Sequence, residues 1–142
     1  MTQEDKELLF KDLSARLSYG VICQVDDEAA GLNDGKLVII DIPKELVRFD
    51  AEYWDAYIDD IKPYLRPMSS MTEEECKELG ELSATIENVG ETLPNVPYYI
   101  EVARPEQIDW LNARHFDYRG LIEKGLAIEV TEENNPYKTE LL

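Results

Sequence analysis

The side chains best suited to catalysis lie close together toward the C-terminal end of the sequence. His115, the only histidine, is followed by Asp117, Tyr118 and Arg119. A histidine oriented by a carboxylate can act as a general acid or base, and an arginine can hold an anionic substrate. Tyr118 or Tyr64 would donate a proton in such a site. The candidate catalytic residues are therefore His115, Asp117, Arg119 and Tyr64.

The same residues also have a structural interpretation, which the sequence favours. His115 would cap the helix before it, while Asp117 would cap the next helix and pair with Arg119. A nucleophilic dyad of Cys23 or Cys76 with His115 is a further alternative, but both cysteines lie in segments with structural patterns. The sequence therefore leans toward a protein without catalytic activity, with an enzyme or small-ligand binder as the alternative.

Motifs for cofactors and metals are missing from the sequence. It contains no glycine-rich phosphate loop, no G-x-S-x-G sequence, no pair of histidines at metal-binding spacing and no C-x-x-C sequence. One histidine and two distant cysteines also argue against a structural zinc site. We therefore expect no metal and no cofactor.

Aromatic and basic side chains supply the candidate binding residues. Tyr53 and Trp54 belong to an aromatic cluster that is either an exposed recognition patch or, more commonly, core packing under a long loop. Trp110 and Tyr118 lie in a stretch with equal numbers of basic and acidic residues. If the chain binds an anionic group, we expect it at that stretch together with Lys62 and Arg66.

The elements around the candidate corner follow from helix and strand signals. Pro105 fits the first turn of a helix, where its missing amide hydrogen costs nothing. Leu111 and His115 would share one face of this helix. A second, short helix would end at Gly125 in a left-handed cap, and alternating apolar residues predict a strand over 126–130.

The N-terminal half begins with an amphipathic helix and continues with strands. Thr2 caps the helix, whose apolar stripe excludes Arg16. Strands are predicted at 21–25 and 36–42, joined by a long polar loop. The continuous apolar run in the second strand predicts a central strand that is buried on both faces. Residues 44–60 fit neither a helical nor a strand period.

The strongest local signal is a capping box formed by Thr72 and Glu75. It predicts a helix that ends near positions 88–90. Before it, Pro63 and Pro67 predict a rigid, extended edge strand or connector.

After that helix, a further strand is predicted over 98–102. These elements predict a single α+β domain over 1–130, with a mainly antiparallel sheet of about four strands and three or four helices. Residues 131–142 are polar and predict a mobile tail.

Charge limits the classes of partner. The 142 residues include 31 acidic and 14 basic ones, for a formal net charge of −17. Nucleic acids and anionic membranes require clustered basic side chains, so neither is expected to bind directly. The charge is compatible with a basic protein partner, a cationic ligand or a protein that imitates nucleic acid, although a solubilising surface also explains it. The acidic N-terminus and the short apolar runs predict a cytoplasmic protein.

Three blocks of the sequence carry a resemblance to a known group of proteins: LLFKDLSARLSYGV, KPYLRPMSSMTEEE and WLNARHFDYRGLIEKGLAIE. They resemble the recurring blocks of a family of small uncharacterised proteins from anaerobic gut bacteria and their prophages. The family has no established activity, so the resemblance implies only a mobile-element or accessory setting. That setting favours a small protein-interaction protein that binds through an acidic face or the Trp54 region.

Overall fold

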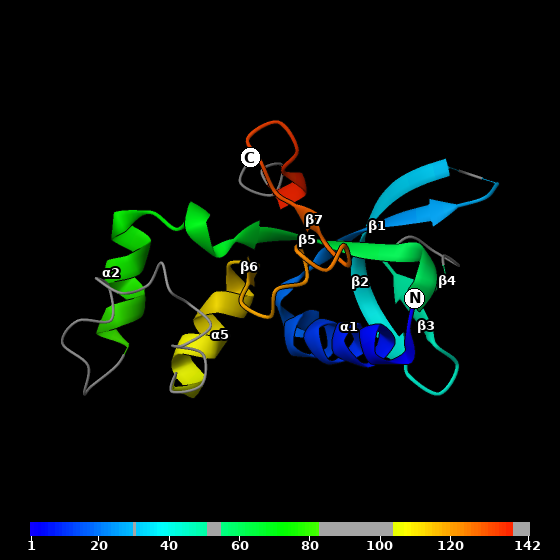
Figure 1. Ribbon diagram of the computed structural model, residues 1–142, viewed down its shortest axis with the longest axis horizontal. Helices are drawn as coiled ribbons and strands as arrows, with labels where there is room; N and C mark the ends of the chain where they lie inside the picture. Colours follow the sequence, from blue (N-terminus) through cyan, green and yellow to red (C-terminus); the bar gives the residue numbers. More distant parts are fainter. Residues whose placement is uncertain (30, 51–54, 83–103, 138–142) are drawn as a thin grey trace.

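A computed structural model describes residues 1–29, 31–50, 55–82 and 104–137 (Figure 1). The described α-helices are α1 (Gln3–Arg16), α2 (Glu73–Glu81) and α5 (Pro105–Ala113). Short 3-10 helices cover Leu17–Tyr19, Ile58–Asp60 and Met68–Ser70. The strands are β1 (Ile22–Asp27), β2 (Gly31–Asp41), β3 (Leu46–Phe49), β4 (Asp55–Tyr57), β5 (Ile61–Pro67), β6 (Phe116–Asp117) and β7 (Ile128–Glu129). None of the described helices combines the length and apolar character needed to cross a membrane.

The strands form one mixed, mostly antiparallel sheet. Its order is β4-β3-β2-β1-β5-β6, and β7 also pairs with β5. Among the described strand pairs, only those of β5 with β6 and β7 are parallel. The predicted α+β class is confirmed, whereas the prediction of about four strands is wrong. The additional strands are β3 and β4, within the segment that fitted neither period, and the two-residue strand β6, all too short to show a repeating pattern.

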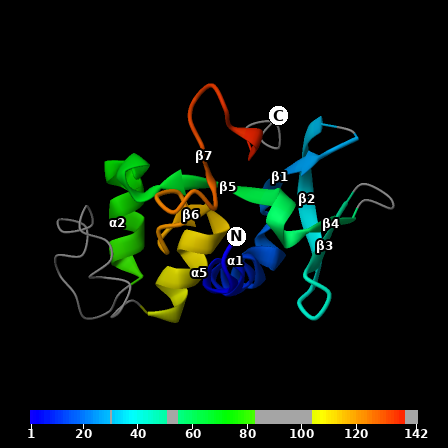
Figure 2. The same cartoon turned by 45° about the vertical axis from the view of Figure 1, so that its right-hand side comes forward.

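Helix α1 covers one face of the sheet, which we call the inner face (Figures 1 and 2). Thr2 caps the helix as predicted, because its side chain accepts a hydrogen bond from the amide of Asp5. Leu9 and Leu13 are fully buried against inner-face residues such as Val25 and Leu65. This cluster is the main hydrophobic core, and it fixes α1 across the sheet.

A second apolar cluster lies at the other end of the molecule, around α2 and α5 (Figure 1). Leu79 of α2 packs with Trp110 and Leu111 of α5 and with Phe116 of β6. The capping box of Thr72 and Glu75 is present as predicted. The predicted end of this helix at 88–90 and the predicted strand over 98–102 lie outside the described residues.

Two predictions about individual strands are wrong. Strand β2 lies inside the sheet, yet Val38 and Ile39 are exposed because the register with β3 shifts between Leu37 and Ile39. Strand β5 is extended as predicted, but it lies between β1 and β7 and is not an edge. Pro63 is tolerated because it is the last residue of β5 that pairs with β1, so its missing amide interrupts little of the ladder.

The described part of the predicted tail is attached to the face of the sheet opposite α1, which we call the outer face. The hydroxyl of Tyr137 accepts a hydrogen bond from the amide of Ile22 (3.0 Å) and donates one to the carbonyl of Tyr64 (2.7 Å). Tyr137 also packs against a small apolar cluster of Ile22, Tyr64 and Val130. Tyr137 therefore fastens the end of this segment to the outer face at β1 and β5, which the polar sequence did not indicate.

Candidate functional site

The chain turns sharply between α5 and β6, and this corner carries most of the candidate catalytic residues. His115 adopts a left-handed backbone conformation, with φ of 64°. Its amide donates to the carbonyl of Asn112 (3.1 Å), and its carbonyl accepts from the amide of Arg66 (2.7 Å). His115 thus occupies the position after the helix where glycine is common. The prediction that it shares a helical face with Leu111 is wrong, because α5 ends at Ala113.

The His115 ring lies against the C-terminal segment. It stacks on the ring of Tyr137, with 3.7 Å between the ring centroids and 8° between the planes. This contact places the corner against the C-terminal segment, which Tyr137 attaches to β1 and β5. The half-buried ring is therefore part of the packing between these two segments.

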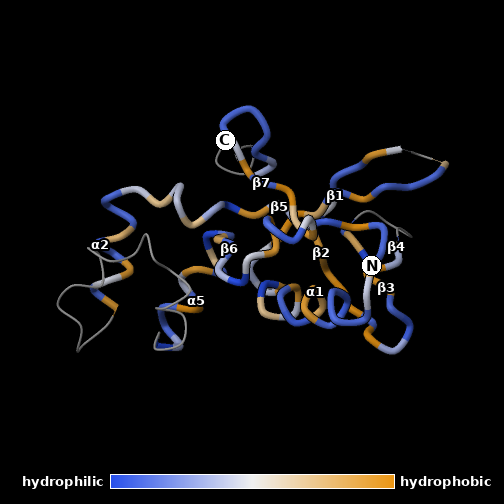
Figure 3. The backbone as a smooth tube through the Cα atoms, viewed as in Figure 1, coloured by the Kyte–Doolittle hydropathy of each residue, from blue (hydrophilic) through white to orange (hydrophobic). Residues whose placement is uncertain are grey.

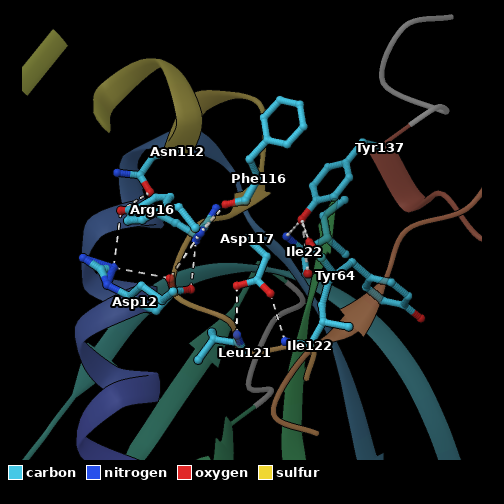
Figure 4. A network of polar contacts seen from close by, with 12 residues as sticks. Asp12, Arg16, Ile22, Tyr64, Asn112, Phe116, Asp117, Leu121, Ile122 and Tyr137 are labelled. Atoms are coloured by element: carbon cyan, nitrogen blue, oxygen red, sulfur yellow. Dashed lines mark hydrogen bonds and ion pairs between the residues drawn. The ribbon is translucent and has the colours of Figure 1, made fainter. Parts of the chain in front are cut away.

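Asp117 is buried and caps the turn that follows it. Its two carboxylate oxygens accept hydrogen bonds from the amides of Leu121 (2.9 Å) and Ile122 (3.0 Å; Figure 4). The predicted short helix is a turn here, although Gly125 has the predicted left-handed conformation, with φ of 74°. Both carboxylate oxygens of Asp117 are engaged by the chain itself, as expected for a structural cap.

Arg119 reaches back to α1 and not to Asp117. Its Nη1 lies 3.4 Å from Oδ1 of Asp12, and its guanidinium also lies against the ring of Tyr118. The Tyr118 hydroxyl donates to Oδ1 of Asn112 (2.8 Å). Tyr118, a candidate for both proton donation and binding, is thus buried and bonded within the chain.

The same carboxylate of Asp12 binds a second arginine, Arg16, from one turn further along α1. Nε of Arg16 lies 2.8 Å from Oδ2 of Asp12, and Nη2 donates to Oδ1 of Asp12 and to the carbonyl of Phe116 (Figure 4). Arg16 was predicted to lie away from the buried stripe, and that prediction is wrong. Its charge is tolerated inside because Asp12 neutralises it and β6 supplies a further acceptor.

Tyr64 lies on the outer face, and its ring points away from Asp117 (Figure 4). Its hydroxyl donates to Oδ1 of Asp34 (2.7 Å) and accepts from the amide nitrogen of Gln24 (3.2 Å). Burial, followed by the hydrogen bond to Asp34, raises the pKa of Tyr64 to about 12. The structure therefore does not bring Tyr64 to Asp117 and Arg119, and the raised pKa opposes ionisation near neutral pH.

The two thiols lie in separate apolar environments. Cys23 is fully buried in the main core, and burial raises its thiol pKa far above the ordinary value. Cys76 is half-buried in α2, where desolvation and the charges of Glu75 and Glu73 raise its pKa. Both thiols are thus kept in the neutral form, which is a poor nucleophile. Among the residues that the structure describes, no group of three side chains could hold a metal ion.

The candidate binding residues Arg66 and Trp110 are also engaged within the chain. Arg66 forms two hydrogen bonds to the Glu75 carboxylate (2.7 and 2.8 Å) and stacks over Phe116. Trp110 is buried against Phe116 and is covered by Arg114. The remaining candidates, Tyr53 and Trp54, lie outside the described residues.

A surface that the sequence did not indicate lies on the outer face of β2, β3 and β4. Val38, Ile39 and Tyr57 are 42%, 48% and 60% exposed there. Strand pairing places Ile39, Arg48 and Asp55 in one row, and Asp41, Leu46 and Tyr57 in the next. We call the surface formed by Val38, Ile39, Leu46, Arg48, Asp55 and Tyr57 the open face. It adjoins the part of the outer face where Tyr137 packs.

A groove lies between α1 and the turn that joins β2 to β3. Its volume is about 370 Å³, with Phe10 and Ile42 among its apolar residues and Glu7, Lys11 and Glu45 among its charged ones. Lys6 of α1 pairs with Glu45 (2.8 Å) and so holds the turn against the helix. Glu7 and Lys11 are exposed, as is usual for the solvent side of a helix.

Comparisons with known proteins find no significant match to this chain. A scan against protein-family models gives no match, and searches of curated proteins and of solved structures find no significant similarity.

Proposed function

We propose that this chain is a small protein-binding module without catalytic activity, and that its binding surface is the open face. The observation that carries the proposal is the exposure of Val38, Ile39 and Tyr57 together on one sheet surface. Neighbouring exposed apolar side chains on a soluble domain are typical of protein contact sites, whereas isolated ones are common everywhere. The setting that we propose is an accessory one, as the sequence resemblance implies.

The energetics of such a contact are favourable. Full burial of an isoleucine, valine or aromatic side chain contributes about 1.5–3 kcal/mol to association. A tyrosine also tends to dominate interfaces, because it offers a large rigid surface and a polar hydroxyl. Tyr57, beside Leu46 and one row from Ile39, is therefore the residue that we expect to contribute most.

The proposal does not place a ligand at the corner around His115. Asp117 is bonded to two backbone amides, and Arg119 is held by Asp12. A ligand there would have to displace these contacts, at a cost of about 1–3 kcal/mol for each buried group left without a partner. The open face requires no such rearrangement.

The test is an affinity capture from a lysate of the native host with matched surface variants. The open-face variant is Ile39→Ser with Tyr57→Ser. The control variant is Ile42→Ser with Leu82→Ser, which changes two exposed apolar residues outside the open face. A partner retained by the wild type and the control, and lost by the open-face variant, supports the proposal. Equal retention by both variants would refute it, provided that circular dichroism shows both to be folded.

A further inference from the structure

The outward positions of the sheet around the open face carry more carboxylates than basic groups. Strand alternation and register direct seven charged side chains to the outer side of the sheet. Six belong to β1–β4, and the seventh is the residue after β3. The seven are Asp26, Asp34, Asp41, Asp50, Asp55, Lys36 and Arg48. Five carboxylates against two cations give this side of the sheet a negative potential.

One of these carboxylates is paired with a cation, and two others are bonded to backbone amides. Arg48 pairs with Asp55 (2.7 Å), and this contact lowers the pKa of Asp55. Among the described contacts, Asp41 and Asp50 accept hydrogen bonds only from the backbone amides of Lys44 and Lys36. A backbone amide leaves the carboxylate charge in place, so both remain available to a cation from outside.

The wider segment has the same sign. Residues 22–60 contain eleven acidic and three basic residues, a formal net charge of −8. The tube coloured by hydropathy shows hydrophilic residues along most of the projecting β1–β2 hairpin beside this face (Figure 3). Nucleic acid and anionic membranes would be repelled by this segment, and a second copy would set two such segments against each other.

We propose, on the basis of the protein-binding function above, that the open face binds a positively charged segment of a partner protein. Apolar side chains of that segment cover Ile39 and Tyr57, while its lysine or arginine side chains meet Asp41 and Asp50. The apolar contacts hold the complex, and the carboxylates select the sign of the partner and speed its association.

A labelled peptide in which valine and lysine alternate tests this inference, with the corresponding valine and glutamate peptide as its counterpart. Fluorescence anisotropy measures the binding of each peptide to the intact chain. The carboxylate variant is Asp41→Asn with Asp50→Asn, because asparagine keeps the acceptor oxygen that each backbone amide needs. The matched control is Glu73→Gln with Glu74→Gln, which makes the same change in net charge at exposed positions of the distant helix α2.

We expect the lysine peptide to bind the wild type and the α2 control alike, and to bind the carboxylate variant about ten-fold more weakly. The glutamate peptide should not bind. Equal weakening by both variants would show that only total charge matters, and would overturn the inference. So would a rise in the anisotropy of labelled chain on adding unlabelled chain that Ile39→Ser with Tyr57→Ser abolishes, because the face would then bind a second copy.

The outcome separates this inference from the proposed function. If Ile39→Ser with Tyr57→Ser abolishes capture of a host partner while the carboxylate variant binds that partner as tightly as the wild type, the protein-binding function stands and the basic partner is wrong. If neither variant changes capture, the open face itself is wrong.

Discussion

Arg16 and Asp12 form an ion pair in which both side chains are completely shielded from solvent. The two residues are one turn of α1 apart. Arg16 donates to the carbonyl of Phe116, and Asp12 binds the guanidinium of Arg119, so the pair joins α1 to the corner between α5 and β6. A strongly acidic protein thus places two arginines and one aspartate at the junction of its parts. At this junction one carboxylate, Asp12, binds both arginines. On the outer side of the sheet, in contrast, the described contacts of Asp41 and Asp50 are to backbone amides.

Removing Asp12 should cost more stability than removing Arg16. Asp12→Leu leaves two guanidinium groups without their shared carboxylate, and we expect a loss of about 3–5 kcal/mol in the free energy of unfolding. Arg16→Met leaves Asp12 paired with Arg119 and should cost less. Urea unfolding at neutral pH measures both. The double variant should be more stable than the sum of the single losses predicts, and strict additivity would contradict the account.

The turn between β2 and β3 contains a second non-glycine residue in a left-handed conformation. Glu45 has φ of 56°, and its carboxylate binds Lys6 of α1. Glu45→Ala removes the ion pair and keeps the strained backbone, whereas Glu45→Gly removes both. We therefore expect the glycine variant to be more stable than the alanine variant by about 1 kcal/mol in thermal or urea unfolding. Equal stabilities would indicate that the turn does not hold this conformation.

The Arg66–Glu75 pair should give stability that depends on pH. The guanidinium of Arg66 holds the pKa of Glu75 below its ordinary value of 4.5. A lowered folded-state pKa means that the unfolded chain binds more protons in the interval between the two values. The contribution is therefore complete above the unfolded-state pKa, and it disappears as the pH falls through the folded-state value.

Glu75→Gln should accordingly lower the free energy of unfolding by about 1 kcal/mol at neutral pH. The difference from the wild type should vanish in acid, where both side chains are neutral. Glu78→Gln is the matched control, because Glu78 pairs with Arg114 (3.2 Å) at a more exposed position. Its effect should be smaller. A difference for Glu75→Gln that stays constant across the acid range would argue against this pairing.

Tyr137 should fasten the C-terminal segment through its hydroxyl. Tyr137→Phe keeps the stack on His115 but leaves the buried amide of Ile22 and the carbonyl of Tyr64 without this partner. We expect a loss of about 1–3 kcal/mol, together with faster hydrogen exchange at the Ile22 amide. Tyr57→Phe, which alters an exposed tyrosine, should change neither quantity. Unchanged exchange at Ile22 in Tyr137→Phe would show that the hydroxyl does not hold the segment.

Local signals in the sequence predicted the helix starts well. The Thr2 cap, the box of Thr72 with Glu75 and the position of Pro105 all appear as expected, because each depends on residues within one helical turn. The left-handed Gly125 is a local signal of the same kind. These features need no knowledge of the rest of the fold.

Features that depend on distant partners were not predictable in the same way. Arg16 looked like a surface residue, because its buried partners include a carbonyl one hundred positions away. Val38 and Ile39 looked like core, because a register shift between two strands cannot be seen in one strand's sequence. Tyr64 and Arg119 were grouped by chemistry, but the sheet separates them.

The most direct test of the open face is a methyl NMR titration of the chain with the captured host partner. Ile39 and Val38 supply methyl groups on the open face, while Ile58 in the main core and Ile108 beside α2 serve as internal references. We expect the Ile39 and Val38 methyl signals to shift or broaden on binding and the two reference signals to stay unchanged. Shifts confined to Ile108 or to residues around His115, with Ile39 unaffected, would contradict this expectation.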